Sequence, residues 1–249
     1  MNTPFKNCLS RGFFPLLIFL LYFCLSLNSQ NLEGNWWFFG VGAGLHFTNG
    51  YPQADTGAPL NVITSSATIS DSNGNLLFYT DGIDVYDRNH NITPNQALAG
   101  YGTTSAGRVL ITKKIGSNSS YHVFSTRYFS NIFSYKLFVF EVDMALNNGY
   151  GDVVPNSIVE LGDSLSRGLA CLDHDDNKSK WILTNKTISG EYYALLVDST
   201  GVDTMPVISQ IGFGGQINSN AAIMSSPNSE RLLTFHGPFG YRAEFFQFN

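Results

Sequence analysis

Short apolar runs separated by polar turns dominate the sequence after about residue 30. The runs are rich in aromatic and β-branched side chains, and the residues between them are mainly Gly, Asn, Asp and Ser. Such runs, broken by turn-forming residues, are typical of β-strands joined by tight turns. Few segments have the Ala, Glu, Lys and Leu content of a helix. The sequence therefore predicts an all-β protein.

One unit of strands recurs four times along the chain. Each copy has an apolar strand, a turn that contains Asn, a second apolar strand, and a third strand that ends in Asp or Asn. The first strands are predicted at 67–70, 108–111, 168–171 and 221–224. The turn residues are Asn73, Asn118, Asn177 and Asn228, and the closing residues are Asp87, Asp143, Asp198 and Asn249. Asn-Gly at 73–74 predicts a type I′ turn.

The turn residues are 45, 59 and 51 positions apart, and the long second interval predicts a loop insertion between Gly149 and Ser166. Propeller blades have about this length, with four strands each. A sheet with an apolar face is not stable alone, so successive units must bury one another. The sequence predicts a β-propeller with tryptophan–aspartate-repeat-like blades. Its repeats lie near 62–103, 104–160, 161–212 and 213–249, and residues 36–47 are a candidate closing strand.

Four repeats suit either a very small ring or a part of a larger one. An open ring would expose sheet edges and an apolar face, which promotes aggregation. We therefore expect the propeller to be incomplete in this chain.

The first 29 residues differ from the rest. Lys6 and Arg11 precede the apolar run 13–27, and small or polar residues follow it. This order is typical of a secretory signal peptide, and an uncleaved membrane anchor is the alternative. Cleavage near Ser29 would leave a mature chain, 30–249, without a membrane span, outside the cell or on its outer surface.

Removal of this segment changes the charge and the cysteine content. It has two basic and no acidic residues, so the net charge moves from −5 to −7. An acidic chain without a basic stripe is not expected to bind nucleic acid. Cys171 alone remains of three cysteines, which excludes an internal disulfide in the mature chain.

Several segments together resemble a known family. They are Asn35-Trp-Trp-Phe-Phe-Gly, Gly-Ala-Gly-Leu at 42–45, Ala-Thr-Ile-Ser-Asp-Ser-Asn-Gly-Asn-Leu-Leu-Phe-Tyr-Thr-Asp-Gly at 67–82, Val-Tyr-Asp-Arg-Asn-His at 85–90, and Pro94-Asn95. They look like the N-terminal propeller of secreted Bacteroidetes proteins that carry a type B sorting domain of the type nine secretion system, often described as gliding motility-associated C-terminal domain proteins. The resemblance is strongest over residues 35–95, and the sorting domain itself is absent from this sequence. It implies export and display or release outside the cell, and no catalytic residues.

Arg108 and Arg167 are the candidate ligand-binding residues. Both precede their turn Asn by ten positions, at the start of a predicted first strand. First strands line the central channel of a propeller, where a guanidinium group can bind a carboxylate, a phosphate or a sugar. The alternative is that each arginine pairs with a neighbouring acid such as Asp163.

Other motifs predict structure and not chemistry. Residues 71–75 lack the spacing of a calcium loop, and 173–177 is expected to be a solvated acidic turn. The five histidines are scattered, and no pair of carboxylates suits glycoside hydrolysis. We therefore expect no catalytic residue, metal or cofactor, and a module that contacts protein or glycan in adhesion, gliding motility or surface assembly. A polysaccharide hydrolase or lyase and a structural spacer are the alternatives.

Overall fold

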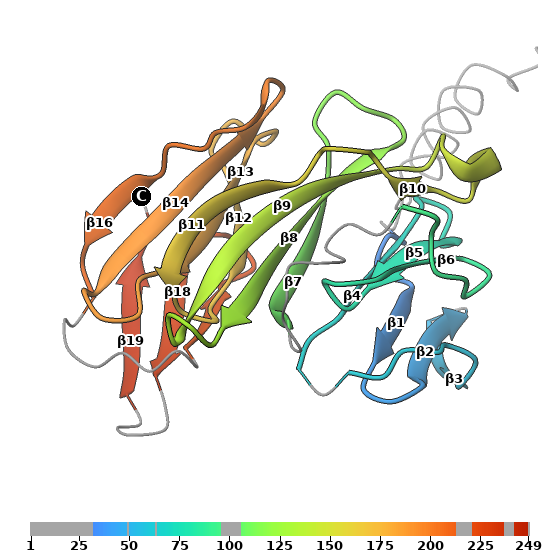
Figure 1. Ribbon diagram of the computed structural model, residues 1–249, viewed down its shortest axis with the longest axis horizontal. Helices are drawn as coiled ribbons and strands as arrows, with labels where there is room; N and C mark the ends of the chain where they lie inside the picture. The colour runs from blue at the N-terminus through green and yellow to red at the C-terminus, as the bar shows by residue number, and fades with distance from the viewer. Residues whose placement is uncertain are drawn as a thin grey trace, which may run out of the picture. The chain divides into compact units, whose positions relative to one another are not determined.

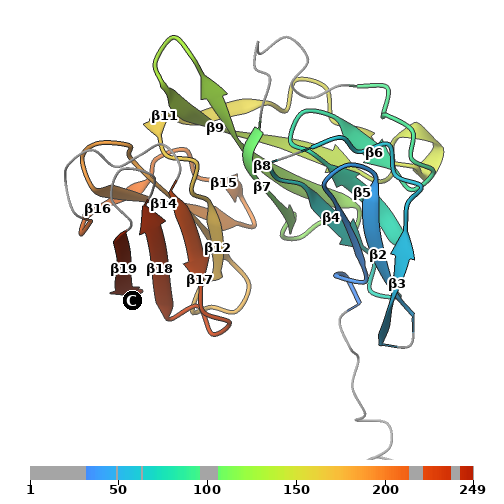
Figure 2. The ribbon, with the colours of Figure 1, turned by 90° about the horizontal axis from the view of Figure 1, so that it is seen from below.

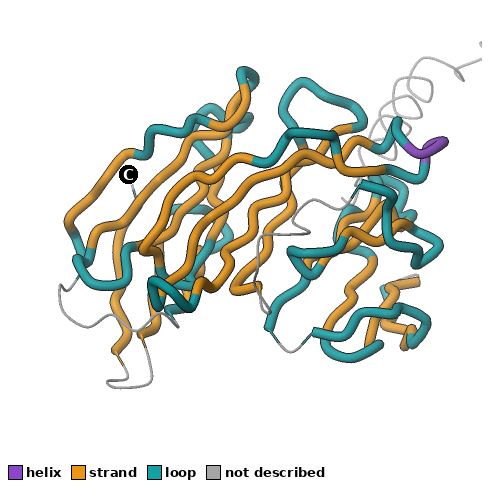
Figure 3. The backbone as a smooth tube through the Cα atoms, in the orientation of Figure 1, coloured by secondary structure: helices purple, strands orange, loops and turns teal. Residues whose placement is uncertain are grey.

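The computed structural model describes residues 32–48, 50–62, 64–95, 106–212, 221–236 and 242–248. Strands and their turns make up nearly all of this part, which holds one short 3-10 helix, η1 (Asn147–Gly149), and no α-helix (Figure 3). The all-β prediction is confirmed. No helix among these residues has the length and apolar character needed to cross a membrane. The predicted signal peptide, residues 1–29, lies outside the described residues.

The described strands form five antiparallel sheets, taken in chain order as sheets I to V (Figure 1). Sheet I contains β1 (Trp36–Phe39), β2 (Ala43–Thr48) and β3 (Tyr51–Asp55). Sheet II contains β4 (Ala67–Ser70), β5 (Leu76–Thr80) and β6 (Val85–Asp87). Sheet V contains β17 (Ala222–Ser225), β18 (Arg231–His236) and β19 (Arg242–Gln247), which lie side by side in Figure 2. In each of these sheets, neighbours in the chain are neighbours in the sheet.

Sheets III and IV share a larger plan. Sheet III contains β7 (Ala106–Lys113), β8 (Ser120–Phe129), β9 (Ser134–Asp143), β10 (Asp152–Val153) and β11 (Val159–Leu165). Sheet IV contains β12 (Ala170–Asp173), β13 (Lys180–Asn185), β14 (Glu191–Asp198), β15 (Gly201–Val202) and β16 (Val207–Gln210). In both, a two-residue strand pairs with the end of the third strand and a longer strand pairs with its beginning.

The sequence predicted a loop insertion between Gly149 and Ser166, and this prediction is wrong. The segment supplies β10 and β11 to sheet III, because both strands pair with β9. β11 also crosses the expected boundary between residues 160 and 161. Four of its seven residues are exposed, since it lies at the edge of the sheet and only Leu161 and Leu165 are buried.

The four predicted first hairpins are present, but the turn at residues 71–75 is not type I′. The Gly74 amide donates to the Asp71 carbonyl at 2.9 Å, and the Asp71 amide donates to the Asn75 carbonyl at 2.8 Å. Only Gly74, not Asn73, has a positive φ. This is a three-residue loop, residues 72–74, whose last residue is left-handed, whereas a type I′ turn needs two positive φ angles. The Asp71 carboxylate accepts the amides of Asn73 and Asn75, so it stabilises the turn.

The acid that closes each third strand also has a local structural role. Oδ1 of Asp87 accepts the amide of Asn89, that of Asp143 accepts the amide of Ala145, and that of Asp198 accepts the amide of Thr200. These contacts are 2.7–2.9 Å long, and each carboxylate bonds the backbone two residues ahead. An aspartate in this position initiates a turn. The repeated acid is thus explained by the chain reversal that follows the strand.

Consecutive sheets pack on one another through four clusters of buried apolar side chains. Each cluster draws its members from two sheets that follow one another in the chain, from sheets I and II to sheets IV and V. Ring pairs across these contacts include Phe38 with Tyr79, Phe78 with Tyr121, and Tyr192 with Phe246, with centroids 4.6, 5.6 and 5.1 Å apart. The order of the sheets in space therefore follows their order in the sequence.

Residues 36–47 differ from the expected closing strand. They form β1 and most of β2, which pair with each other, and β2 also pairs with β3. Neither pairs with sheet V in the described part of the chain. Both outermost sheets carry exposed apolar side chains, namely Trp37 and Phe39 on sheet I and Met224, Phe235 and Phe245 on sheet V.

Candidate functional site

The structure brings the first strands of neighbouring sheets close together. β1 contacts β4, β4 contacts β7, and β12 contacts β17. Direct hydrogen bonds join these regions: the Val109 amide donates to Ser65 Oγ at 3.2 Å, and Ser225 Oγ donates to the Cys171 carbonyl at 3.4 Å. Arg108 is the third residue of β7, and Arg167 lies three residues before β12.

Arg167 is held by backbone groups of β7 and of the segment that precedes β4. Its Nε donates to the Gly107 carbonyl and its Nη2 to the Thr64 carbonyl, each at 3.2 Å. Its own carbonyl accepts from Thr126 Oγ1, also at 3.2 Å. The side chain is half-buried. Arg167 therefore connects the residues that precede β12 with those at the starts of β4 and β7.

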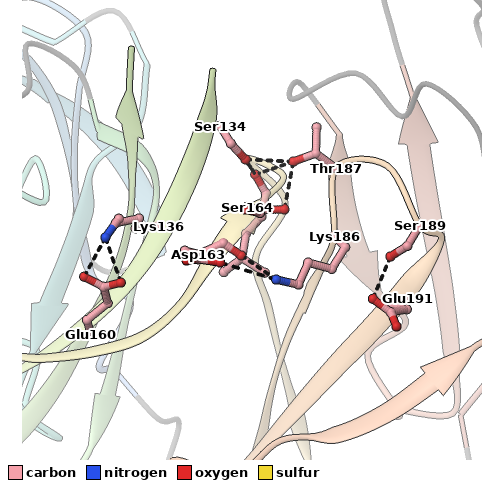
Figure 4. Close-up of polar contacts among 10 residues, drawn as sticks. Ser134, Lys136, Glu160, Asp163, Ser164, Lys186, Thr187, Ser189 and Glu191 are labelled. Atoms are coloured by element: carbon pink, nitrogen blue, oxygen red, sulfur yellow. Dashed lines mark hydrogen bonds and ion pairs between the residues drawn. The ribbon is translucent and has the colours of Figure 1, made fainter. Parts of the chain in front are cut away.

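The pairing of Arg167 with Asp163, offered as an alternative by the sequence, is absent among the described contacts. Asp163 instead faces Lys186 (Figure 4), whose Nζ lies 3.5 Å from Oδ1 of Asp163 and donates to its carbonyl at 2.8 Å. Nearby, Ser134 Oγ donates to the Leu165 carbonyl at 2.8 Å and lies 2.9 Å from Thr187 Oγ1. Lys186 thus satisfies this acid and leaves the guanidinium of Arg167 to the backbone carbonyls.

Arg108 has a different environment. Its backbone amide donates to Thr126 Oγ1 at 2.8 Å, and its side chain is exposed. No hydrogen bond or ion pair joins its guanidinium to another described residue. Loss of hydration among neighbouring atoms lowers the pKa of this group, and the positive charge of Arg167 lowers it further. The guanidinium of Arg108 is therefore accessible to an anion, and the positive charge of Arg167 adds to the attraction.

Thr126 positions both arginines, and sequence reasoning missed it. It is fully buried near the end of the second strand of its sheet. Thr80 and Thr184 lie at corresponding places, are equally buried, and donate to the Asp84 and Gly168 carbonyls at 2.7 and 2.9 Å. A threonine at the end of each apolar second strand was the available signal.

Replacing Thr126 with Val should lower the free energy of unfolding by about 1 kcal/mol, because the partly buried Arg108 amide would lose its acceptor. Denaturant unfolding measures this change. Thr112→Val is the matched control, since the Thr112 hydroxyl is buried with no hydrogen-bond partner in the described structure. The control should be neutral or slightly stabilised. Equal losses in the two variants would contradict this role of Thr126.

Arg127, the next residue, was also missed. It is the largest fully buried side chain, with 1% of its surface exposed. Burial lowers its pKa, while the charges of Asp81 and Asp84 raise it. Burial raises the pKa of Asp84, the charge of Asp81 adds to this effect, and Arg127 opposes it. An arginine directly after Thr126 in a largely apolar strand was the signal in the sequence.

The two oxygen-rich turns behave as expected for hairpins. Oδ1 of Asp176 accepts the amides of Lys178 and Ser179 at 2.8 and 2.7 Å, as Asp71 does in its own turn. Among the residues that the structure describes, no three His, Cys, Asp or Glu side chains are grouped to hold a metal ion.

The chain shows no match to known families. No family model matches it, and no curated protein is similar to it at a significant level.

Proposed function

We propose that the five sheets are blades of a β-propeller. Three observations support this: the sheets follow one another in space in chain order, the first strands of several neighbouring sheets are in contact, and sheets III and IV repeat one plan with a fourth strand. Propeller blades are meanders of four antiparallel strands that pack face to face. In this proposal, the exposed apolar faces of sheets I and V are where the ring would close or continue.

We further propose that the protein is an extracellular binding module of the cell surface. The predicted signal peptide and the family resemblance support export, and they favour adhesion, gliding motility or surface assembly as its setting. The exposed Arg108 carries the binding proposal. The guanidinium of Arg167 donates to the carbonyl of Gly107, the residue before Arg108, so two positive side chains gather here and favour an anionic group. The partner would be a surface glycan or protein that presents a carboxylate, phosphate or sulfate group.

A binding array of acidic and neutral glycans and peptides tests this function. We expect binding to acidic members, and Arg108→Ala should weaken it about tenfold, which corresponds to the loss of one charge-assisted contact. Arg231→Ala is the matched control, because Arg231 is also exposed on a strand but belongs to sheet V. Its binding should equal that of the unmodified protein.

The same array separates binding from catalysis. Release of reducing sugar from a bound polysaccharide would replace the binding proposal with a hydrolase or lyase. Absence of any bound ligand would favour a structural spacer. Equal binding by Arg108→Ala and the unmodified protein would show that the ligand does not contact Arg108.

A further inference from the structure

A cavity of about 430 Å³ opens between the first strands of three sheets, at the end opposite to Arg108 and Arg167. Ile69 of β4, Ile111 of β7 and Cys171 of β12 supply apolar lining. Four lysines complete it, two from the end of β7 and the residue after it and two from the turn and strand after β12: Lys113, Lys114, Lys178 and Lys180. We call this cavity the lysine cleft.

The concentration of positive charge in the lysine cleft is unusual for this chain. The protein has a net charge of −5 and seven lysines, and four of the seven line this one cavity. Glu33 is the single carboxylate among its described lining residues. Positive side chains that share a cleft raise the local concentration of anions.

Two of the four ammonium groups have no partner within the described part of the protein. Lys114 pairs with Glu141 at 2.8 Å, and Lys180 pairs with Asp173. The ammonium groups of Lys113 and Lys178 make no hydrogen bond or ion pair with another residue that the structure describes, and both side chains are exposed. Lys113 lies in β7 of sheet III and Lys178 in the turn between β12 and β13 of sheet IV, so a ligand between them would contact parts of two sheets at once.

The thiol of Cys171 does not compensate this charge. Burial raises its pKa to about 11, with the charge of Lys180 opposing the shift, so the group is neutral at physiological pH. The volume of the cleft lies in the range of small-molecule sites, about 300–1,000 Å³. A lysine ammonium is a compact point charge that suits phosphate and carboxylate groups.

We propose that the lysine cleft binds a small polyanion, a molecule that carries two or more carboxylate or phosphate groups. Its anionic groups contact Lys113 and Lys178, and its apolar part lies against Ile69 and Ile111. The site is separate from that of Arg108, because five residues of extended β7 place Lys113 roughly 17 Å from Arg108.

Isothermal titration of the purified protein at low ionic strength tests this site with pyrophosphate, citrate and trigalacturonate as probes. Binding of pyrophosphate alone would indicate a phosphate compound, and binding of trigalacturonate an acidic saccharide. We expect at least one probe to bind, and the double variant Lys113→Ala/Lys178→Ala to weaken it at least about tenfold. Lys113→Arg/Lys178→Arg should retain most of the affinity, since it keeps both charges.

The control is Lys136→Ala/Lys186→Ala, which removes two lysines that pair with Glu160 and Asp163 outside the cleft. Equal weakening in this control would show unspecific attraction and overturn the proposal, as would the absence of binding by all three probes. Arg108→Ala should leave the affinity for the probe unchanged. The experiment therefore tests the lysine cleft independently of the proposed binding at Arg108.

A second readout does not depend on the folding of variants. A bound probe should slow the reaction of Cys171 with a maleimide, measured on its own peptide by mass spectrometry, because Cys171 lines the cleft. A labelling rate that a saturating probe leaves unchanged would also overturn the proposal.

Discussion

Replacing Phe78 with Ala should lower the free energy of unfolding by about 3–5 kcal/mol. The ring is completely buried in β5, where it packs against sheet III and lies edge to face with Tyr121 at 5.6 Å. Truncation removes the apolar contacts of the ring and leaves a cavity between sheets II and III. Denaturant unfolding followed by tryptophan fluorescence measures the loss.

Phe245→Ala is the control for this change. Phe245 also lies in a strand, but 77% of its surface is exposed. Its replacement should change stability by no more than about 0.5 kcal/mol. A similar cost at both positions would mean that the outer face of sheet V is covered in solution, and a negligible cost at Phe78 would contradict the packing of sheet II on sheet III.

Replacing Arg127 with Met should cost about 3–5 kcal/mol at neutral pH, because it leaves the carboxylates of Asp81 and Asp84 without their buried cation. The pKa of Asp84 is already raised above 3.8 by burial, and without Arg127 it rises further. A carboxyl whose pKa is higher in the folded state contributes stability only while it is protonated. The deficit of the variant should therefore shrink as the pH falls from 7 toward 4.

Unfolding of Arg127→Met at several pH values tests this directly. Adding Asp84→Asn to the variant should restore part of the lost stability, since the amide removes the uncompensated charge. Arg231→Met, at an exposed position, should show neither the loss nor the pH dependence. A deficit that is constant with pH, together with no gain from Asp84→Asn, would exclude this electrostatic role of Arg127.

The sequence predicted the strands whose side chains are largely buried. The first three strands of each repeat were found because Val, Leu, Phe and Tyr mark them clearly, as in β5 and β13. β3, β11 and β16 were missed because they lie at sheet edges, are largely exposed, and contain residues such as Pro52 and Gly162 that weaken a strand pattern.

The candidate site was predicted in part. Position in the repeat placed Arg108 and Arg167 near the starts of first strands, but it treated them as equivalent, whereas Arg108 lies within β7 and Arg167 precedes β12. Their difference depends on carbonyls more than fifty residues away, since Arg167 bonds those of Gly107 and Thr64. The turn asparagines were similarly misaligned: Asn177 has a positive φ, whereas Gly74 and Ser229 have it in their turns. In these three turns a left-handed residue recurs, although its residue type differs.

Packing between consecutive sheets also has a consequence for how the chain acquires its structure. Because each sheet contacts mainly the ones before and after it in sequence, few distant segments must find each other, and folding can propagate from one sheet to the next. A chain that emerges from the ribosome or from a secretion channel in order would meet each new sheet's partner already formed. Assembly in this order shortens the time during which the apolar face of a sheet is exposed to solvent.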